Sequence, residues 1–173
     1  MRAKYVGALA VVVVVALTGC TAPEPEPEEL TVSAAGARYL DAICPVNAAW
    51  EGVDLEVDRL RLVLSRGDTG DTAAIGGALA DLERASTAAS ETLSDETVAW
   101  PAKAEGGVAE VAETLAADAE QAARAAKLPA VDLVDYSWEG VKAIGSAAAA
   151  TRAALGLPEG VGSACADRPV SAR

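Results

Sequence analysis

Apolar residues between Tyr39 and Leu64 recur at alternating intervals of four and three residues. This spacing places them on one face of an α-helix, in the heptad pattern of helices that pack in left-handed bundles. Proline is tolerated in the first turn of a helix but kinks or breaks its interior. We therefore expect a short helix over residues 33–43, a kink or restart at Pro45, and a main helix to about Ser65. The apolar positions are Tyr39, Ile43, Val46, Trp50, Val53, Val57, Leu60 and Leu64.

Three further helices are predicted by the same kind of pattern. A Gly- and Asp-rich turn over residues 65–71 ends at Asp71, a suitable N-cap for the second helix. Pro101 suits the first turn of the third helix and Pro129 that of the fourth, while Gly156 is a C-terminal cap. The predicted core positions of the second helix are Ile75, Leu79, Leu82, Ser86, Ala89 and Leu93; of the third, Ala104, Val108, Val111, Leu115, Ala119, Ala122 and Ala126; and of the fourth, Val134, Trp138, Val141, Ile144, Ala148 and Leu155.

The composition supports an all-α fold. Phe is absent, aromatic residues make up 3 % of the chain, and alanine is abundant throughout the helical part. Small side chains suit closely packed helices better than a sheet, where β-branched and aromatic residues are enriched. We predict an up-down-up-down four-helix bundle over residues 33–173, with an irregular tail after the fourth helix.

The first twenty residues form a targeting segment. Arg2 and Lys4 precede a run of about a dozen apolar residues, which is too short to span a bilayer as a helix. The run ends in Leu17-Thr18-Gly19-Cys20. This order resembles the lipobox of bacterial lipoproteins. The resemblance implies that residues 1–19 are a signal peptide, that Cys20 becomes a lipid-modified N-terminus, and that the protein is held on the outer face of the cell membrane. The alternative is an ordinary signal peptide with an incidental cysteine.

Residues 20–32 are predicted to be a spacer after the lipid anchor. Residues 23–28 alternate proline with glutamate; such a segment cannot form a helix, and its glutamates repel one another. An extended spacer of this length holds the folded domain about 25–30 Å from the membrane.

The chain has three cysteines. Lipidation of Cys20 leaves Cys44 and Cys165, and outside the cytoplasm such a pair can form a lasting disulfide. A disulfide that closes a loop of about 120 residues stabilises by roughly 4–5 kcal/mol in the chain-entropy model. The alternative is two unpaired buried thiols. In the predicted bundle the disulfide pins the tail across one end, with Trp50 and Trp100 near that end and Tyr136 and Trp138 near the other.

The charge and the missing residue types exclude several functions. A net charge of −12 disfavours nucleic acid as a partner, because phosphate backbones are repelled. The chain contains no histidine, which removes the commonest general base and the usual metal ligand of helical bundles. Glu51, Asp54 and Asp58 share one helix face. This face is either a cation site or, as the simpler alternative, a solvated acidic surface. We therefore predict no catalytic residues, no metal and no cofactor, with carboxylate-based chemistry as the exception.

Two functions remain open. The first is a non-enzymatic interaction or structural module that binds another envelope protein, suggested by the tether and the acidic helices. The second is a carrier of a small apolar ligand or lipid, with Trp50, Trp100 and Trp138 as candidate pocket residues between the helices. The alternative role of the three indoles is simple packing in the core.

The substitution Cys20→Ala tests the lipobox. We expect loss of both acylation and signal-peptide cleavage, because the modified cysteine is the residue that the processing requires. Metabolic labelling with a fatty acid and the electrophoretic mobility of the product report the two steps. Normal processing and membrane anchoring of the variant would overturn the prediction.

Overall fold

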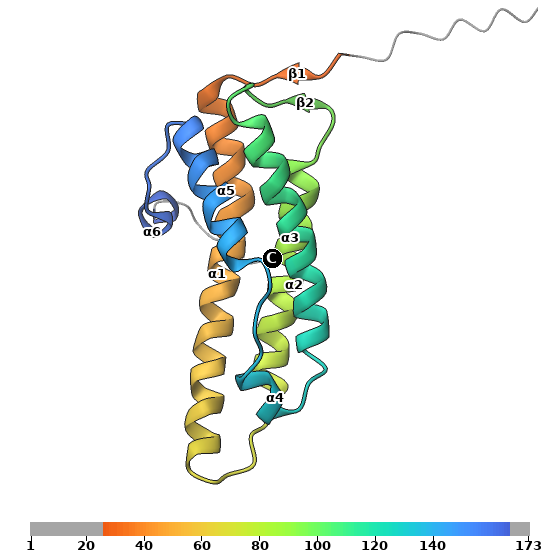
Figure 1. Ribbon diagram of the computed structural model, residues 1–173, viewed down its shortest axis with the longest axis vertical. Helices are drawn as coiled ribbons and strands as arrows, with labels where there is room; N and C mark the ends of the chain where they lie inside the picture. The colour runs from red at the N-terminus through yellow and green to blue at the C-terminus, as the bar shows by residue number, and fades with distance from the viewer. Residues whose placement is uncertain (1–25, 167–173) are drawn as a thin grey trace, which may run out of the picture.

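The computed structural model describes residues 26–166, and this part of the chain is mostly helical (Figure 1). The predicted signal peptide, Cys20 and the first part of the spacer lie outside the described residues, as does the end of the tail. The helices are α1 (Val32–Ser65), α2 (Ala73–Leu93), α3 (Glu105–Ala125), α4 (Ala130–Val134), α5 (Val141–Ala154) and α6 (Val161–Cys165). In residues 26–166, no helix is both long and apolar enough to cross a membrane.

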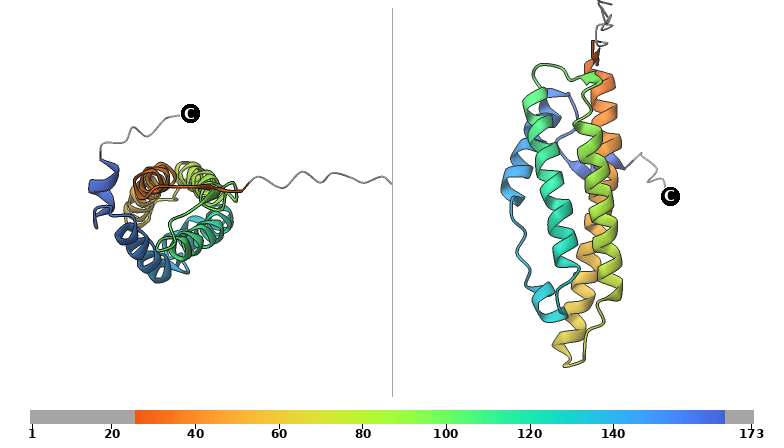
Figure 2. Two further views of the ribbon diagram at one scale, coloured as in Figure 1. Left: turned by 90° about the horizontal axis from the view of Figure 1, so that it is seen from above. Right: turned by 90° about the vertical axis from the view of Figure 1, so that its right-hand side faces the viewer.

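Helices α1, α2, α3 and α5 lie side by side around a shared apolar core (Figure 2). The sequence pattern predicted this core well in α2, where the six predicted positions are the six buried residues. The burial of one leucine or isoleucine side chain contributes about 1.5–3 kcal/mol, so these contacts dominate the stability. The N-cap of α2 lies one residue later than predicted, at Thr72, whose side chain forms no capping hydrogen bond. The Asp71 carboxylate still accepts a hydrogen bond of 2.9 Å from the Ala73 N–H at the start of the helix.

Helix α1 differs from the prediction at Pro45. The expected short helix and restart are wrong, because α1 is helical from Val32 to Ser65 with Pro45 inside it. A proline in a helix interior costs about 3 kcal/mol. The side chains next to it, Ile43, Cys44 and Val46, are all buried, whereas Pro45 itself is exposed. Tertiary packing on both sides of Pro45 therefore outweighs its intrinsic cost.

The predicted fourth helix is interrupted. The structure contains α4 and α5, separated by the non-helical residues 135–140, so Trp138 lies outside any helix. Gly140 begins α5 with a φ of 82°, in the left-handed region that favours glycine. The predicted cap at the other end is confirmed, because the Gly156 and Leu157 N–H groups donate to the carbonyls of Ala153 and Arg152, in the Schellman pattern.

The end of the spacer belongs to the folded domain. Strand β1 (Glu28–Glu29) pairs in parallel with strand β2 (Val98–Ala99), which lies between α2 and α3. The Glu28 N–H donates to Thr97 O at 2.9 Å, and the Leu30 N–H donates to Ala99 O at 3.0 Å. The described structure therefore begins before Ser33, and the chain enters the domain beside the α2–α3 connection (Figure 1).

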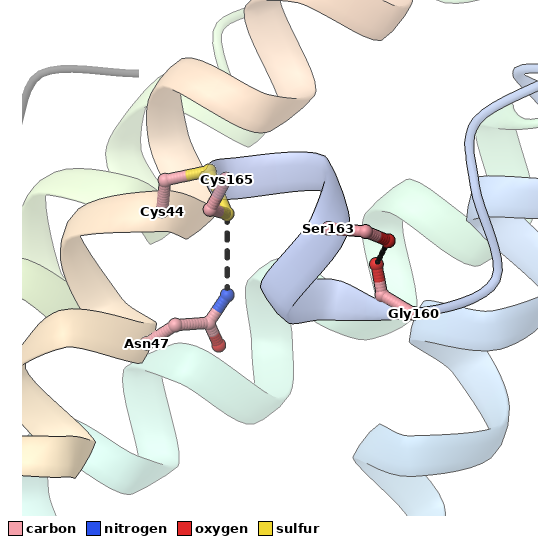
Figure 3. Close-up of a disulfide and its surroundings, with 5 residues drawn as sticks. All are labelled: Cys44, Asn47, Gly160, Ser163 and Cys165. Atoms are coloured by element: carbon pink, nitrogen blue, oxygen red, sulfur yellow. Dashed lines mark hydrogen bonds between the residues drawn. A yellow bond between two sulfur atoms is a disulfide. The ribbon is translucent and has the colours of Figure 1, made fainter. Parts of the chain in front are cut away.

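The predicted disulfide between Cys44 and Cys165 is present, with 5.5 Å between the two Cα atoms. Its position differs from the prediction, because Cys44 lies about 18 Å along α1 from Val32, well inside the helix. The disulfide therefore fixes the short helix α6 against the side of α1 rather than across one end (Figures 1 and 3). The Asn47 side-chain amide donates a hydrogen bond of 3.8 Å to Cys165 Sγ, as Figure 3 shows.

Gly107 allows α3 and α5 to approach closely. A β-carbon built at this position would lie 2.5 Å from Thr151 Oγ1, and Thr151 is almost fully buried. The neighbouring Gly106 is exposed, and a β-carbon there would meet nothing within 4 Å. The two adjacent glycines therefore have different roles, although both weaken the intrinsic helix propensity.

We predict opposite effects for Gly106→Ala and Gly107→Ala on the free energy of unfolding. Gly106→Ala raises it by up to about 1 kcal/mol, because alanine favours the helix. Gly107→Ala lowers it by about 1–2 kcal/mol, because the overpacked Thr151 must shift. Urea unfolding followed by circular dichroism measures both values, and an increase in both variants would contradict the close approach.

Candidate functional site: a cavity between helices

A cavity of about 340 Å³ lies between α1, α3 and α5. Its walls are mainly apolar and include Ile43 and Val46 from α1, Leu115 from α3, and Ile144 and Ala148 from α5. Tyr39 and Trp50 both line it and are eleven residues apart on α1, so it extends about 16 Å along that helix. The other lining residues are Asn47, Val111, Asp118, Trp138, Val141, Gly145 and Arg152.

Two of the three candidate tryptophans meet at one end of this cavity. The rings of Trp50 and Trp138 pack edge to face with 4.6 Å between their centroids, and Tyr136 packs on Trp138 at 5.1 Å. The prediction that Trp50 and Trp138 lie at opposite ends of the domain is therefore wrong. The prediction fails because the fourth helix is broken after α4. Six non-helical residues advance farther along the domain than the 9 Å or so that six helical residues cover, so Trp138 lies closer to Trp50 than a continuous helix would place it.

Trp100 does not belong to the cavity, and its place in the predicted pocket is corrected. Its indole N–H donates to Leu93 O at 3.2 Å, at the end of α2. The ring is half-buried and packs against the core beside strand β2. Trp100 therefore has the role of a core plug with a satisfied N–H, while Trp50 and Trp138 line the cavity.

Gln121 fixes the position of Trp138. Its side-chain amide donates to Glu139 O at 3.2 Å and accepts from the Glu139 N–H at 2.9 Å. The Gln121 side chain is on the buried face of α3, with 4 % of its surface exposed. These two bonds satisfy backbone groups that the missing helix would otherwise have paired, so they stabilise the break beside Trp138.

Asp118 lies one helical turn before Gln121, and it is a buried carboxyl on the cavity wall. Its side chain is only 5 % exposed, and it accepts one long hydrogen bond of 3.4 Å from Gln121 Nε2. Burial raises the pKa of Asp118 to about 6, because the charged form loses its hydration. Asp118 therefore changes its charge in a mildly acidic range where ordinary carboxyl groups remain ionised.

Tyr39 and Arg152 form the opposite end of the cavity. The Tyr39 hydroxyl and the Arg152 Nε are buried, and neither has a hydrogen-bond partner in residues 26–166. Burial raises the pKa of Tyr39, and the charge of Arg152 offsets part of this increase. The guanidinium therefore lies near the hydroxyl.

The acidic face of α1 predicted as a possible cation site has a simpler role. Asp58 pairs with Arg61 at 3.3 Å, and Glu51 and Asp54 are exposed. In the described part of the chain, no cluster of three or more acidic or cysteine side chains could hold a metal ion. Asn47 faces both the disulfide and the cavity, so it joins these two features.

No family model, curated protein or solved structure was found that matches this chain.

Sequence reasoning missed the polar groups of the site, although two of them left a signal. Arg152 lies four residues after Ala148, on the predicted apolar line of the fourth helix. Asp118 lies three residues after Leu115, on the core-facing side of the third helix. A charged residue on a core-facing position is the pattern that could have identified both.

We predict that Asp118→Asn stabilises the protein in a pH-dependent way. Above pH 6 the native carboxylate is ionised and buried, so the wild type is less stable than the variant by roughly 3 kcal/mol. As the pH falls from 6 to about 4, the native carboxyl binds its proton before the unfolded one does, and this disadvantage disappears. Urea unfolding at pH 4 and at pH 7.5 measures this difference in the free energy of unfolding.

Glu113→Gln is the matched control, because Glu113 is exposed on the same helix. This variant should follow the wild type at both pH values. An Asp118→Asn effect that is equal at pH 4 and pH 7.5 would contradict the buried charge.

Proposed function

We propose that this protein is a lipid-anchored, outward-facing lipoprotein that binds a small, mainly apolar molecule in the cavity between α1, α3 and α5. The observation that carries the proposal is the cavity itself, with about 340 Å³ and apolar walls. Ligand pockets in proteins are typically of this kind, with a few polar groups among apolar side chains. The lipobox residues up to Cys20 and the Pro-Glu spacer support the location at the cell membrane.

The fold supports this role. We class the domain as an up-down-up-down four-helix bundle in which the fourth helix is formed by α4 and α5. The break between them lets an extended segment replace part of a helix in the bundle wall. Pockets between the helices of bundles are common binding sites, and here the break lies next to the cavity.

The proposed role is binding and not catalysis. Chemistry based on paired carboxylates needs two acidic side chains that converge, and Asp118 is the single carboxyl that lines the cavity among the described residues. The proposal includes no cofactor, no metal and no nucleic acid. The negative charge of the chain supports the absence of nucleic acid from the proposal, because phosphate backbones are repelled.

A contact with another envelope protein is the second candidate function. Leu55 and Leu62 are each 51 % exposed and lie seven residues apart, so they share one face of α1. Two exposed leucines give smaller support than a formed cavity does, because single apolar residues are common on protein surfaces.

The substitution Ala148→Phe tests the binding proposal. Ala148 lines the cavity on α5, and a phenyl ring there fills part of the space that a ligand would occupy. We expect the affinity for a neutral apolar probe, N-phenylnaphthylamine, to fall about tenfold or more, measured by the fluorescence that the probe gains in an apolar site. Ala150→Phe is the matched control, because Ala150 is exposed on the same helix. Equal probe binding by the wild type and Ala148→Phe would contradict the proposal.

A further inference from the structure

The two ends of the cavity differ in chemistry. One end has the indoles of Trp50 and Trp138 and the carboxyl of Asp118. The other end has the hydroxyl of Tyr39 and the guanidinium of Arg152, about 16 Å away along α1. A long, narrow ligand would therefore meet a different polar environment at each of its ends.

Two polar groups at the Tyr39 and Arg152 end have no hydrogen-bond partner among the described residues. Tyr39 has no exposed surface, and its hydroxyl and the Arg152 Nε are both buried without partners in residues 26–166. A buried donor that loses its water and gains no partner costs about 1–3 kcal/mol. Both unsatisfied groups can donate a hydrogen bond, so the group that would satisfy them is an acceptor.

The charge of Arg152 is also unbalanced. Five other arginines pair with a carboxylate, namely Arg38, Arg59, Arg61, Arg84 and Arg124. Arg152 forms no ion pair within the described range, although the chain is strongly acidic and Arg152 is half-buried. A ligand with one negative charge would supply the missing partner.

We infer that the cavity binds an amphiphile with a carboxylate head, which accepts hydrogen bonds from Tyr39 Oη and Arg152 Nε, while its apolar chain extends toward Trp50 and Trp138. The inference rests on the proposed function and adds the class and the direction of the ligand. The carboxyl of Asp118 at the far end supports this direction, because its charge would repel a carboxylate placed there.

An ω-bromo derivative of decanoic acid tests both the class and the direction. Bromine quenches indole fluorescence at short range, and in the inferred pose it lies beside Trp50 and Trp138. With the full chain in phosphatidylcholine vesicles, we expect saturable quenching that is lost in Trp50→Phe/Trp138→Phe and kept in Trp100→Phe. Equal quenching in these two variants would overturn the inferred direction.

The recognition of the head group is tested by Arg152→Gln, by Tyr39→Phe and by the matched ω-bromo-decanol. Hydrogen bonds to charged groups predict a loss of about tenfold or more in affinity for the acid in Arg152→Gln, and a smaller loss in Tyr39→Phe, which keeps the ring that packs in the core. Both substitutions should lower the affinity for the alcohol much less, because its uncharged oxygen accepts weaker hydrogen bonds than a carboxylate does. The wild type should bind the acid more tightly than the alcohol.

The outcomes separate the two levels of the proposal. Equal affinity for acid and alcohol, unchanged in both variants, would overturn the carboxylate inference and leave the proposed binding function in place. Saturable quenching by neither ligand, together with no probe binding, would overturn the binding function itself.

Discussion

The cavity depends on two hydrogen bonds between the Gln121 side chain and the backbone of Glu139. A helix that continued through residues 135–140 would satisfy its own backbone groups. Where the helix stops, those groups need other partners, and a buried amide side chain can serve as donor and acceptor at once. Gln121 therefore stabilises the non-helical segment beside the core by pairing its backbone groups. The segment in turn carries Trp138 to Trp50, and this contact closes one end of the cavity.

The groups around the cavity reduce the stability of the domain. An uncharged Asp118 would be easier to bury than the carboxylate, and the Tyr39 hydroxyl has no partner in the described structure. The space itself also lacks the dispersion contacts that a filled core would provide. Such costs are typical of sites where function competes with packing. The disulfide and the well-packed contact of α2 with α3 offset them elsewhere in the same domain.

Local patterns in the sequence were sufficient where a single helix face decides the outcome. The six core residues of α2, the Gly156 cap and the disulfide partners followed from spacing and from the cysteine count. The errors arose where tertiary contacts oppose local preference. Pro45 remains helical because its neighbours are buried, and the run from Pro129 to Leu155 is not one helix because Gln121 pairs with Glu139. A periodic pattern cannot reveal either contact, since each involves residues that are distant in the sequence. The candidate site shows the same division, because the tryptophans were evident and their pairing was not.

The bond between Cys44 and Cys165 converts the main part of the domain into a covalent ring. The connections between α1, α2, α3, α4 and α5 all lie inside this ring. A protease that cuts once in any of these connections opens the ring without separating the pieces, and both remain attached to the chain that precedes Cys44. Separation of the two pieces after one such cut therefore requires a second cut inside the ring or reduction of the disulfide.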